Sequence, residues 1–183
     1  MINSLFIGTR LEALEALKRY TNVELIVTKK DSWVFNKYNN SEINIQLIDK
    51  TNKSEIFDLL SKIETRLMLS AGFPYILPDY VFNSDALFVN SHPGLLPSYK
   101  GYNAIKDALK YDEEHLGITV HYMIEDVDAG EIIFQEKVSV KNLPIQDIYG
   151  LLFSVVEPFV ITKALEIIIN KHFHRLLHNC GKI

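Results

Sequence analysis

Two short segments of this 183-residue chain gather side chains that could transfer protons and stabilise charge. The first reads Asn90-Ser91-His92-Pro93-Gly94-Leu95-Leu96-Pro97 and follows a short apolar run. Asn90 and His92 are two residues apart, so on an extended strand both side chains point to the same face. An amide can donate a hydrogen bond to a developing oxyanion, and an imidazole can transfer protons near neutral pH. The pair therefore favours a catalytic role, although a buried histidine that caps a turn would also fit His92.

The second segment is acidic. It holds three carboxylates within four residues, Glu125, Asp126 and Asp128, and then turns at Ala129-Gly130 into an apolar run. Acidic residues are also common in the solvated turns of hairpins. Taken alone, this segment fits a surface turn as well as a functional site.

The elements that must carry these segments alternate along the chain. Apolar periodicity predicts strands at 4–7, 23–27, 43–47, 66–70, 87–90, 117–123 and 132–140, and helices at 11–20, 53–62, 103–111 and 145–169, the last with a kink or break at Pro158. Strand–helix alternation indicates an α/β fold, with a Rossmann-like, mostly parallel sheet flanked by helices. The turn at 125–130 predicts an antiparallel hairpin at one edge. Residues 29–40, rich in polar and aromatic side chains, are expected to form an irregular loop.

In such a sheet, ligands bind beyond the carboxyl ends of the strands. We therefore expect the loops that follow the strands at 87–90 and 117–123 to meet at one edge and form the site. At this length, residues 1–183 are expected to form a single domain.

Composition excludes several classes of protein. Apolar residues make up 48% of the chain and charged residues 23%, which is typical of globular proteins. A net charge of −4 argues against a protein that mainly binds nucleic acid, and the single cysteine, Cys180, excludes a disulfide framework. Polar residues interrupt the longest apolar stretch, and the first residues do not form a signal peptide. A cytoplasmic protein with no membrane partner is the expectation.

Together, the two segments resemble a known family. The pattern Asn-x-His-Pro-x-Leu-Leu-Pro, with Asp-x-Gly-x-Ile beginning 36 residues after His92, resembles the formyltransferases that use 10-formyltetrahydrofolate. That family includes glycinamide ribonucleotide transformylase, methionyl-tRNA formyltransferase and the sugar N-formyltransferases. The resemblance extends over about residues 66–140 and implies the formyltransferase fold.

The resemblance assigns roles by position. It implies that Asn90, His92 and Asp128 are catalytic, that Asp128 raises the pKa of His92 and orients its ring, and that loss of any one lowers turnover about 10²-fold or more. The supporting residues would be His121, Gly101 and Gly130. The residues that bind the folate would be Phe73, Tyr75, Ile76, Leu77, Ile124, Glu125, Asp126 and Val127. The cosubstrate would be 10-formyltetrahydrofolate, and no metal is needed.

The amine that accepts the formyl group is less well specified. The purine branch of the family carries a Gly-Asn-Gly-Ser-Asn loop whose backbone binds a phosphate, whereas this chain has Gly8-Thr9-Arg10 there, with Arg10 as a weak candidate for a phosphate contact. The methionyl-tRNA branch adds a further domain of about a hundred residues for RNA. Elimination therefore favours a small-molecule amine, a nucleotide-linked amino sugar, over glycinamide ribonucleotide. A folate-binding protein without turnover is a third alternative.

The last part of the chain carries two weaker signals. His174, His178 and Cys180 could ligate zinc, but no fourth ligand is near, so no metal site is expected. Seven apolar residues are expected to be core, with a surplus that could form a homodimer interface: Ile145, Ile148, Leu152, Val155, Phe159, Leu165 and Ile168.

Overall fold

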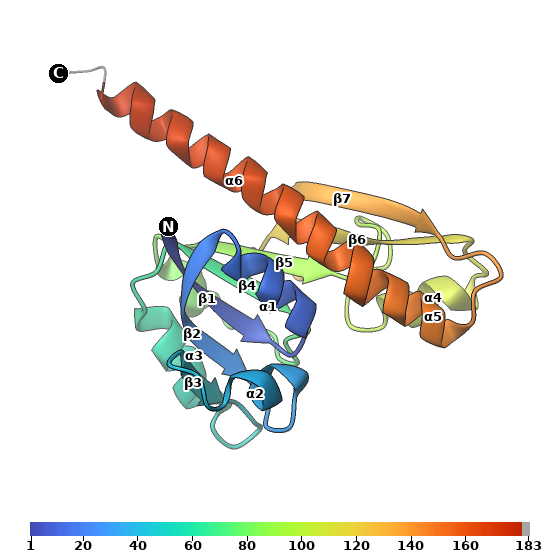
Figure 1. The fold of residues 1–183 in the computed structure, drawn as a ribbon, viewed down its shortest axis with the longest axis horizontal. Helices are drawn as coiled ribbons and strands as arrows, with labels where there is room; N and C mark the ends of the chain where they lie inside the picture. The colour runs from blue at the N-terminus through green and yellow to red at the C-terminus, as the bar shows by residue number, and fades with distance from the viewer. Residues whose placement is uncertain (181–183) are drawn as a thin grey trace.

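The computed structural model describes residues 1–180, with side chains placed up to residue 171. Seven strands form one sheet in the order β3-β2-β1-β4-β5-β6-β7 (Figure 1). Their bounds are β1 Ile2–Gly8, β2 Thr21–Thr28, β3 Asn44–Leu47, β4 Leu67–Ala71, β5 Leu87–His92, β6 His115–Tyr122 and β7 Ile132–Ser139. β1 to β5 are parallel, while β6 and β7 are antiparallel additions at one edge. The predicted α/β fold with an antiparallel edge hairpin is confirmed.

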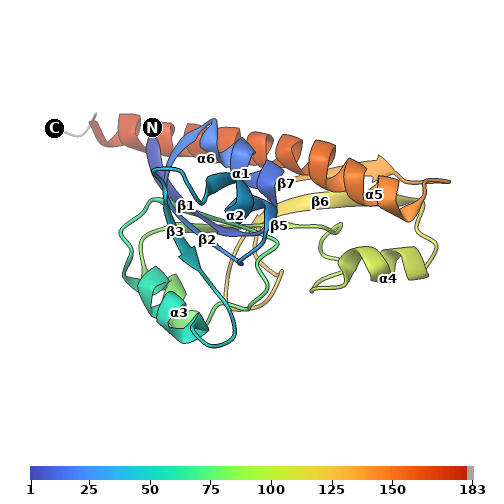
Figure 2. The same ribbon diagram turned by 60° about the horizontal axis from the view of Figure 1, so that its bottom comes forward.

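Helices cover both faces of this sheet. Their bounds are α1 Leu11–Lys18, α2 Trp33–Tyr38, α3 Lys53–Lys62, α4 Ala104–Lys110, α5 Ile145–Leu151 and α6 Glu157–Cys180, with a short 3₁₀ helix η1 at Asp79–Asn83 and a π-helical turn η2 at Leu152–Val156. α1 and α6 lie together on one face and α3 lies on the other (Figure 2).

Strand β1 shows how the sheet is buried from both sides. Phe6 belongs to the apolar cluster on the α1 and α6 side, whereas Leu5 and Ile7 belong to the cluster that includes residues of α3. Successive side chains of a strand point to opposite faces, so a continuous apolar run suits a strand covered on both sides. This is why the apolar runs located the parallel strands.

The expected irregular loop at 29–40 is wrong in its second half, because α2 forms there. The Ser32 hydroxyl accepts a hydrogen bond of 3.0 Å from the backbone N–H of Phe35 and caps the helix. Val34 and Tyr38 are four residues apart and both are buried, so one face of the short helix joins the core. The many polar residues around them hid this spacing.

Of the kink or break expected at Pro158, the break is wrong, since helix continues from α5 through η2 into α6. Proline removes one backbone donor from a helix, and the π-helical turn at Leu152–Val156 immediately precedes this position. Of the seven expected core residues, four are buried and three, Ile145, Val155 and Phe159, are exposed.

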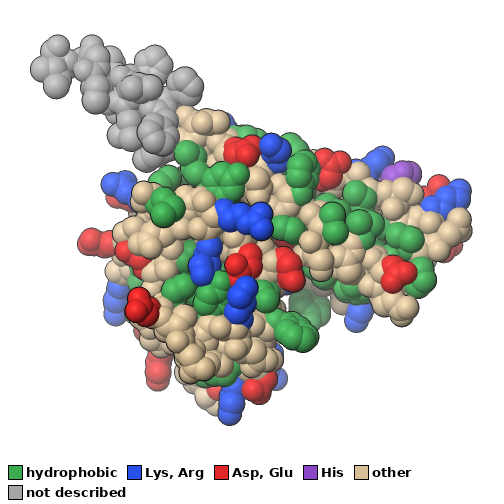
Figure 3. Space-filling view, viewed as in Figure 1, with side chains coloured by type: hydrophobic (Ala, Val, Ile, Leu, Met, Phe, Trp, Pro, Cys, Tyr) green, Lys and Arg blue, Asp and Glu red, His purple; other side chains and the backbone are tan. Residues whose placement is uncertain are grey.

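The surface of this helical face is mixed in charge. Lys and Arg side chains are interspersed with Asp and Glu side chains on the face seen in Figure 3. None of the helices in the described residues combines the length and the apolar character that crossing a membrane requires. The side chains of His174, His178 and Cys180 lie outside the described residues.

The strand order reverses between β1 and β4, and Gly8 ends β1 at this point. Its φ of +142° and a position for Cβ only 1.9 Å from the carbonyl oxygen of Ala71 leave room for glycine alone. We expect Gly8→Ala to lower the free energy of unfolding by about 3 kcal/mol, measured by urea denaturation. Gly150→Ala is the matched control, because a Cβ there meets no atom within 4 Å, and it should stabilise α5 by up to about 1 kcal/mol. Equal stability of the two variants would contradict this account of Gly8.

Candidate active site

A cavity of about 920 Å³ opens at the reversal of strand order. Its walls come from the loop after β1, the loop after β4, the end of β5 and the loop after β6. Open α/β sheets bind ligands in the crevice at this point, because the loops on either side diverge there. Asn90, His92 and Asp128 all line this cavity.

The loop after β6 reaches the site by a different route from the one expected. β6 runs antiparallel to β5, so its carboxyl end does not lie at the same edge of the sheet as that of β5. The loop at 123–131 folds back instead and places Asp128 against His92. Gly130 allows this return, because a Cβ there would lie 1.8 Å from the carbonyl oxygen of Tyr122.

Asp128 is the centre of the cluster. Its Oδ2 lies 3.2 Å from Nδ1 of His92 and accepts a hydrogen bond of 2.8 Å from the backbone N–H of Gly101. Its Oδ1 lies 3.4 Å from Nε2 of His121 and 3.4 Å from Nδ2 of Asn90. Four residues that the resemblance picked out thus surround the carboxylate of Asp128.

Two main-chain carbonyls fix which nitrogen of each histidine carries a proton. Nε2 of His92 lies 2.7 Å from the carbonyl oxygen of Tyr99, and Nδ1 of His121 lies 2.8 Å from that of Tyr122. A carbonyl oxygen only accepts, so both of these nitrogens donate. The remaining ring nitrogens face Asp128, and a further proton can be held there.

Burial and charge act in opposite directions on these groups. Burial lowers the pKa of His92 below its ordinary value, against the attraction of Asp128 and the hydrogen bond to Tyr99. Burial alone would raise the pKa of Asp128, but His121, His92 and the Gly101 N–H together hold it below its ordinary value. Both shifts act in one sense: they favour the carboxylate form of Asp128 and the neutral form of His92.

Seven of the eight residues expected to bind folate line the same cavity: Phe73, Tyr75, Ile76, Leu77, Ile124, Glu125 and Val127. Three apolar side chains among them, Ile76, Ile124 and Val127, are exposed at the cavity although the core of the protein is well formed. Exposed apolar side chains in the lining of a cavity suit a largely apolar ligand.

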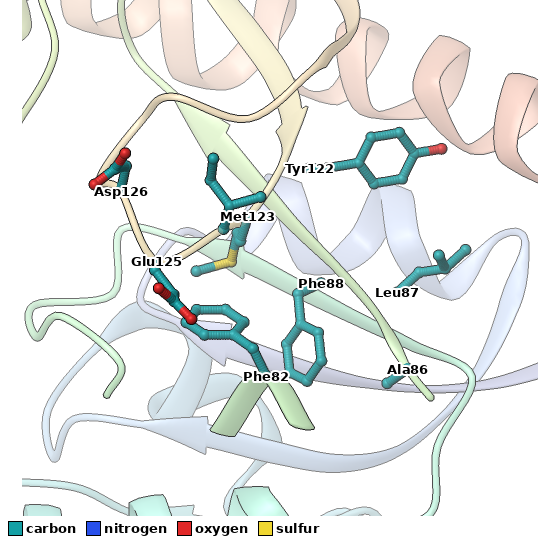
Figure 4. Close-up of a pocket in the computed structure, with 9 residues that line it drawn as sticks. Phe82, Ala86, Leu87, Phe88, Tyr122, Met123, Glu125 and Asp126 are labelled. Carbon is teal, nitrogen blue, oxygen red and sulfur yellow. The ribbon is translucent and has the colours of Figure 1, made fainter. Parts of the chain in front are cut away.

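The eighth, Asp126, lies on the far side of the same loop. It borders a second pocket of about 520 Å³, in which Met123 points toward the rings of Phe82 and Phe88 (Figure 4). The two rings pack edge to face, 5.1 Å apart between centroids. Four residues border both cavities, Phe82, Met123, Ile124 and Glu125, so the loop at 123–131 is a wall shared by the two.

The loop after β1 differs from its expected role. Thr9 and Arg10 line the cavity, but the Arg10 guanidinium turns inward and forms an ion pair of 2.6 Å with Glu157. Sequence reasoning missed Glu157, although an acid inside an apolar stretch and directly before Pro158 was a visible signal. It also missed Lys29, Lys106, Tyr149 and Phe153, which line the cavity from elements far apart in the sequence.

The protein thus has an α/β fold with a cleft beside the reversal of strand order. The side chains gathered in this cleft are the amide of Asn90, the imidazoles of His92 and His121 and the carboxylate of Asp128. In the described part of the chain, no group of three or more His, Cys, Asp or Glu side chains is arranged to hold a metal ion.

Comparison with known proteins identifies the family. The sequence pattern of the family described as "Formyl transferase" matches residues 3–147. The chain is 37% identical over 147 residues to the trifunctional purine biosynthetic protein adenosine-3 of Gallus gallus, covering 73% of this chain and 15% of that protein. It is 34% identical over 102 residues to methionyl-tRNA formyltransferase of Staphylococcus epidermidis, covering 55% of this chain and 33% of that protein. The chain belongs to the formyl transferase family, which confirms the resemblance.

Solved structures show the same fold. Phosphoribosylglycinamide formyltransferase from Anaplasma phagocytophilum superposes with a TM-score of 0.78 at 24% identity, covering 92% of this chain and 86% of that one. The enzyme from Campylobacter jejuni gives 0.73 at 25% identity, covering 91% and 97%. The chain thus matches nearly the whole of these structures but at most about a third of the two curated relatives above.

Proposed function

We propose that this protein transfers the formyl group of 10-formyltetrahydrofolate to a primary amine. The observation that carries the proposal is the cluster at Asp128, where Asn90, His92 and His121 meet one carboxylate at the edge of an apolar cleft. Membership of the formyl transferase family agrees with this chemistry.

The residues present can perform each part of the transfer. A neutral amine attacks the formyl carbon, and the carbonyl electron pair moves to the oxygen, where Asn90 can donate a hydrogen bond. The attacking nitrogen loses its proton to the His92–Asp128 pair, whose carboxylate stabilises the imidazolium that forms. The bond from the formyl carbon to the folate nitrogen then breaks, and that nitrogen takes up the proton. The reaction needs no nucleophilic side chain.

The folate is best accommodated between the two walls of the cleft. Ile76 on one wall and Ile124 and Val127 on the other offer apolar contact to a flat ring system. Burying these exposed side chains against a ligand would supply about 25 cal/mol for each Å² of apolar surface removed from water. The second pocket beside Met123 extends this surface along the same loop.

Two acceptors have support. Glycinamide ribonucleotide is favoured by the comparisons, since the solved structures are phosphoribosylglycinamide formyltransferases. A nucleotide-linked amino sugar is favoured by the loop after β1, which has a single glycine and an arginine already paired with Glu157. The glycine-rich phosphate loop expected of the purine branch is absent from Gly8-Thr9-Arg10.

An assay of tetrahydrofolate release tests the proposal. The protein is incubated with 10-formyltetrahydrofolate and, separately, with glycinamide ribonucleotide and a panel of nucleotide-linked amino sugars. We expect release that depends on one of these amines. Folate binding without release with any amine would favour the non-catalytic alternative, and absence of folate binding in calorimetry would overturn the proposal.

The pH profile provides an independent check. If neutral His92 takes the proton, kcat/KM falls at low pH as His92 becomes protonated. Because burial lowers the pKa of His92, this fall should occur below the ordinary histidine value of about 6.5. A kcat/KM profile whose acid limb lies above pH 7 would contradict this role for His92.

A further inference from the structure

A buried ion pair contacts β5, the strand that carries Asn90 and His92. Nη1 of Arg10, from the loop after β1, is 2.6 Å from Oε1 of Glu157 at the start of α6. The Glu157 side chain is fully buried, and that of Arg10 is 15% exposed. The ring of Phe153 lies beside the guanidinium, with 4.9 Å between the ring centroid and Cζ. These residues join two parts of the chain that are 147 positions apart.

The pair is attached to β5 through Ser91. Nη2 of Arg10 donates a hydrogen bond of 3.0 Å to the carbonyl oxygen of Ser91, and the Ser91 hydroxyl donates one of 2.5 Å to Oε1 of Glu157. The pairing of β4 with β5 ends where Ala71 meets Ser91. On its other side β5 stays paired with β6 as far as His92, so Arg10 holds the backbone of β5 on the side where pairing with β4 ends. Ser91 stands between Asn90 and His92, so whatever fixes its main chain also fixes where those two side chains point.

Stability alone does not account for this arrangement. Oε2 of Glu157 is buried and has no hydrogen-bond partner among the described residues, and burial raises the pKa of this carboxyl despite the adjacent guanidinium. Buried ion pairs are often no more stabilising than apolar residues of similar volume. The burial of this pair costs free energy, and the pair is bonded to β5. Such a pair is suited to fixing the position of the β5 backbone.

We propose that Arg10 and Glu157 are positioning residues, which hold the end of β5 so that Asn90 and His92 face Asp128 in the catalytic geometry. In this role Arg10 binds Glu157 and the Ser91 carbonyl inside the protein, and it does not bind a phosphate of the acceptor. The proposal rests on the proposed function where turnover is the readout, but the arrangement of the side chains can be tested without turnover.

The main test removes both charges together. In Arg10→Met/Glu157→Leu no unpaired charge remains buried, so the midpoint of urea denaturation should stay close to that of the wild type. Ser91 loses the donor to its carbonyl, and we expect kcat to fall about 10-fold while KM for 10-formyltetrahydrofolate changes less than 2-fold. Glu166→Gln, which removes the charge of a half-exposed acid on the same helix, is the control and should leave both constants unchanged.

A second variant covers the case in which the double variant does not fold. Arg10→Lys keeps the positive charge but cannot bond Glu157 and the Ser91 carbonyl together as a guanidinium does. It should fold with nearly normal stability and still lower kcat. A stable double variant, or a stable Arg10→Lys variant, with the kcat of the wild type would overturn the proposal.

A third experiment measures the pKa of His92 directly by NMR titration. The charged groups that face His92 are Asp128 on the loop after β6, His121 on β6 and Arg10 on the loop after β1. Glu157→Gln leaves the Arg10 charge uncompensated, so the pKa of His92 should fall below that of the wild type. An unchanged titration of His92 would show that the pair does not act on the site. Because this arm needs no turnover, it stays informative if the wild type fails to transfer formyl groups, an outcome that would overturn only the proposed function.

Discussion

Replacing Asp128 by asparagine should lower kcat by about 10²- to 10³-fold without unfolding the protein. The carboxylate lies against Nδ1 of His92, Nε2 of His121, Nδ2 of Asn90 and the N–H of Gly101, so in the proposed mechanism it orients the cluster and stabilises an imidazolium. An amide at this position keeps the size of the side chain but loses the charge. Without the charge, the pKa of His92 falls further and the ring accepts the amine proton less readily.

Asparagine is the appropriate replacement because of the backbone at this position. Asp128 has a φ of +52°, in the left-handed region, which asparagine adopts more readily than alanine does. Asp112 has a φ of +54° and is exposed, so Asp112→Asn makes the same change in the same conformation away from the cavity. Steady-state kinetics and urea denaturation of both variants give the comparison. Equal kcat values for the two would remove Asp128 from the mechanism.

Much of the fold was predictable because its signals are local. Strands such as β1 and β4 are buried from both faces, so they appear in the sequence as short apolar runs. The alternation of Asn90, Ser91 and His92 placed two polar side chains on one face from the strand period alone. The spacing of 36 residues from His92 to Asp128 does not by itself predict that the two side chains meet. It became informative only through the resemblance to a family.

The parts that could not be predicted depend on contacts between distant residues. The direction of β6 is decided by how it pairs with β5, and that direction determines the route by which Asp128 returns to the site. The partner of Arg10 lies 147 positions away, on a helix whose sequence reads as apolar core. The ion pair that engages Arg10 inside the protein therefore became visible only in three dimensions.

These distant contacts also bear on the choice of acceptor. Tyr149 and Phe153 also line the cavity, with ring centroids 5.8 Å apart, and the ring of Phe153 lies beside the guanidinium of Arg10. Lys29 and Lys106 line the cavity and are exposed, so the positive charge open to an anionic acceptor lies at these residues. The phosphate of an acceptor would therefore meet positive charge at Lys29 and Lys106 and not at a glycine-rich loop after β1. Kinetics with glycinamide ribonucleotide and with nucleotide-linked amino sugars can distinguish the two acceptors.

Asn90→Asp should cause the largest loss of all, with kcat lowered by about 10³-fold or more. Loss of a single oxyanion donor typically lowers kcat by about 10²- to 10³-fold, and Asn90→Ala should fall in that range. The aspartate variant removes the same donor and also places a carboxylate where Nδ2 lies 3.4 Å from Asp128 and where negative charge develops on the formyl oxygen. Two carboxylates this close cannot both ionise easily, so one of them should bind a proton near neutral pH.

The two Asn90 variants together separate donation from packing. If Asn90 donates to the oxyanion, kcat decreases from wild type to Asn90→Ala and again to Asn90→Asp, while the midpoint of urea denaturation changes little for the alanine variant. Asn36→Asp, the same change on the exposed surface of α2, should leave kcat unchanged. Equal kcat values for Asn90→Ala and the wild type would instead mean that Asn90 only orders Asp128 and His121. The oxyanion would then have to be stabilised by the protonated imidazole, a role that the acid limb of the pH profile would reveal as activity rising when His92 gains its proton.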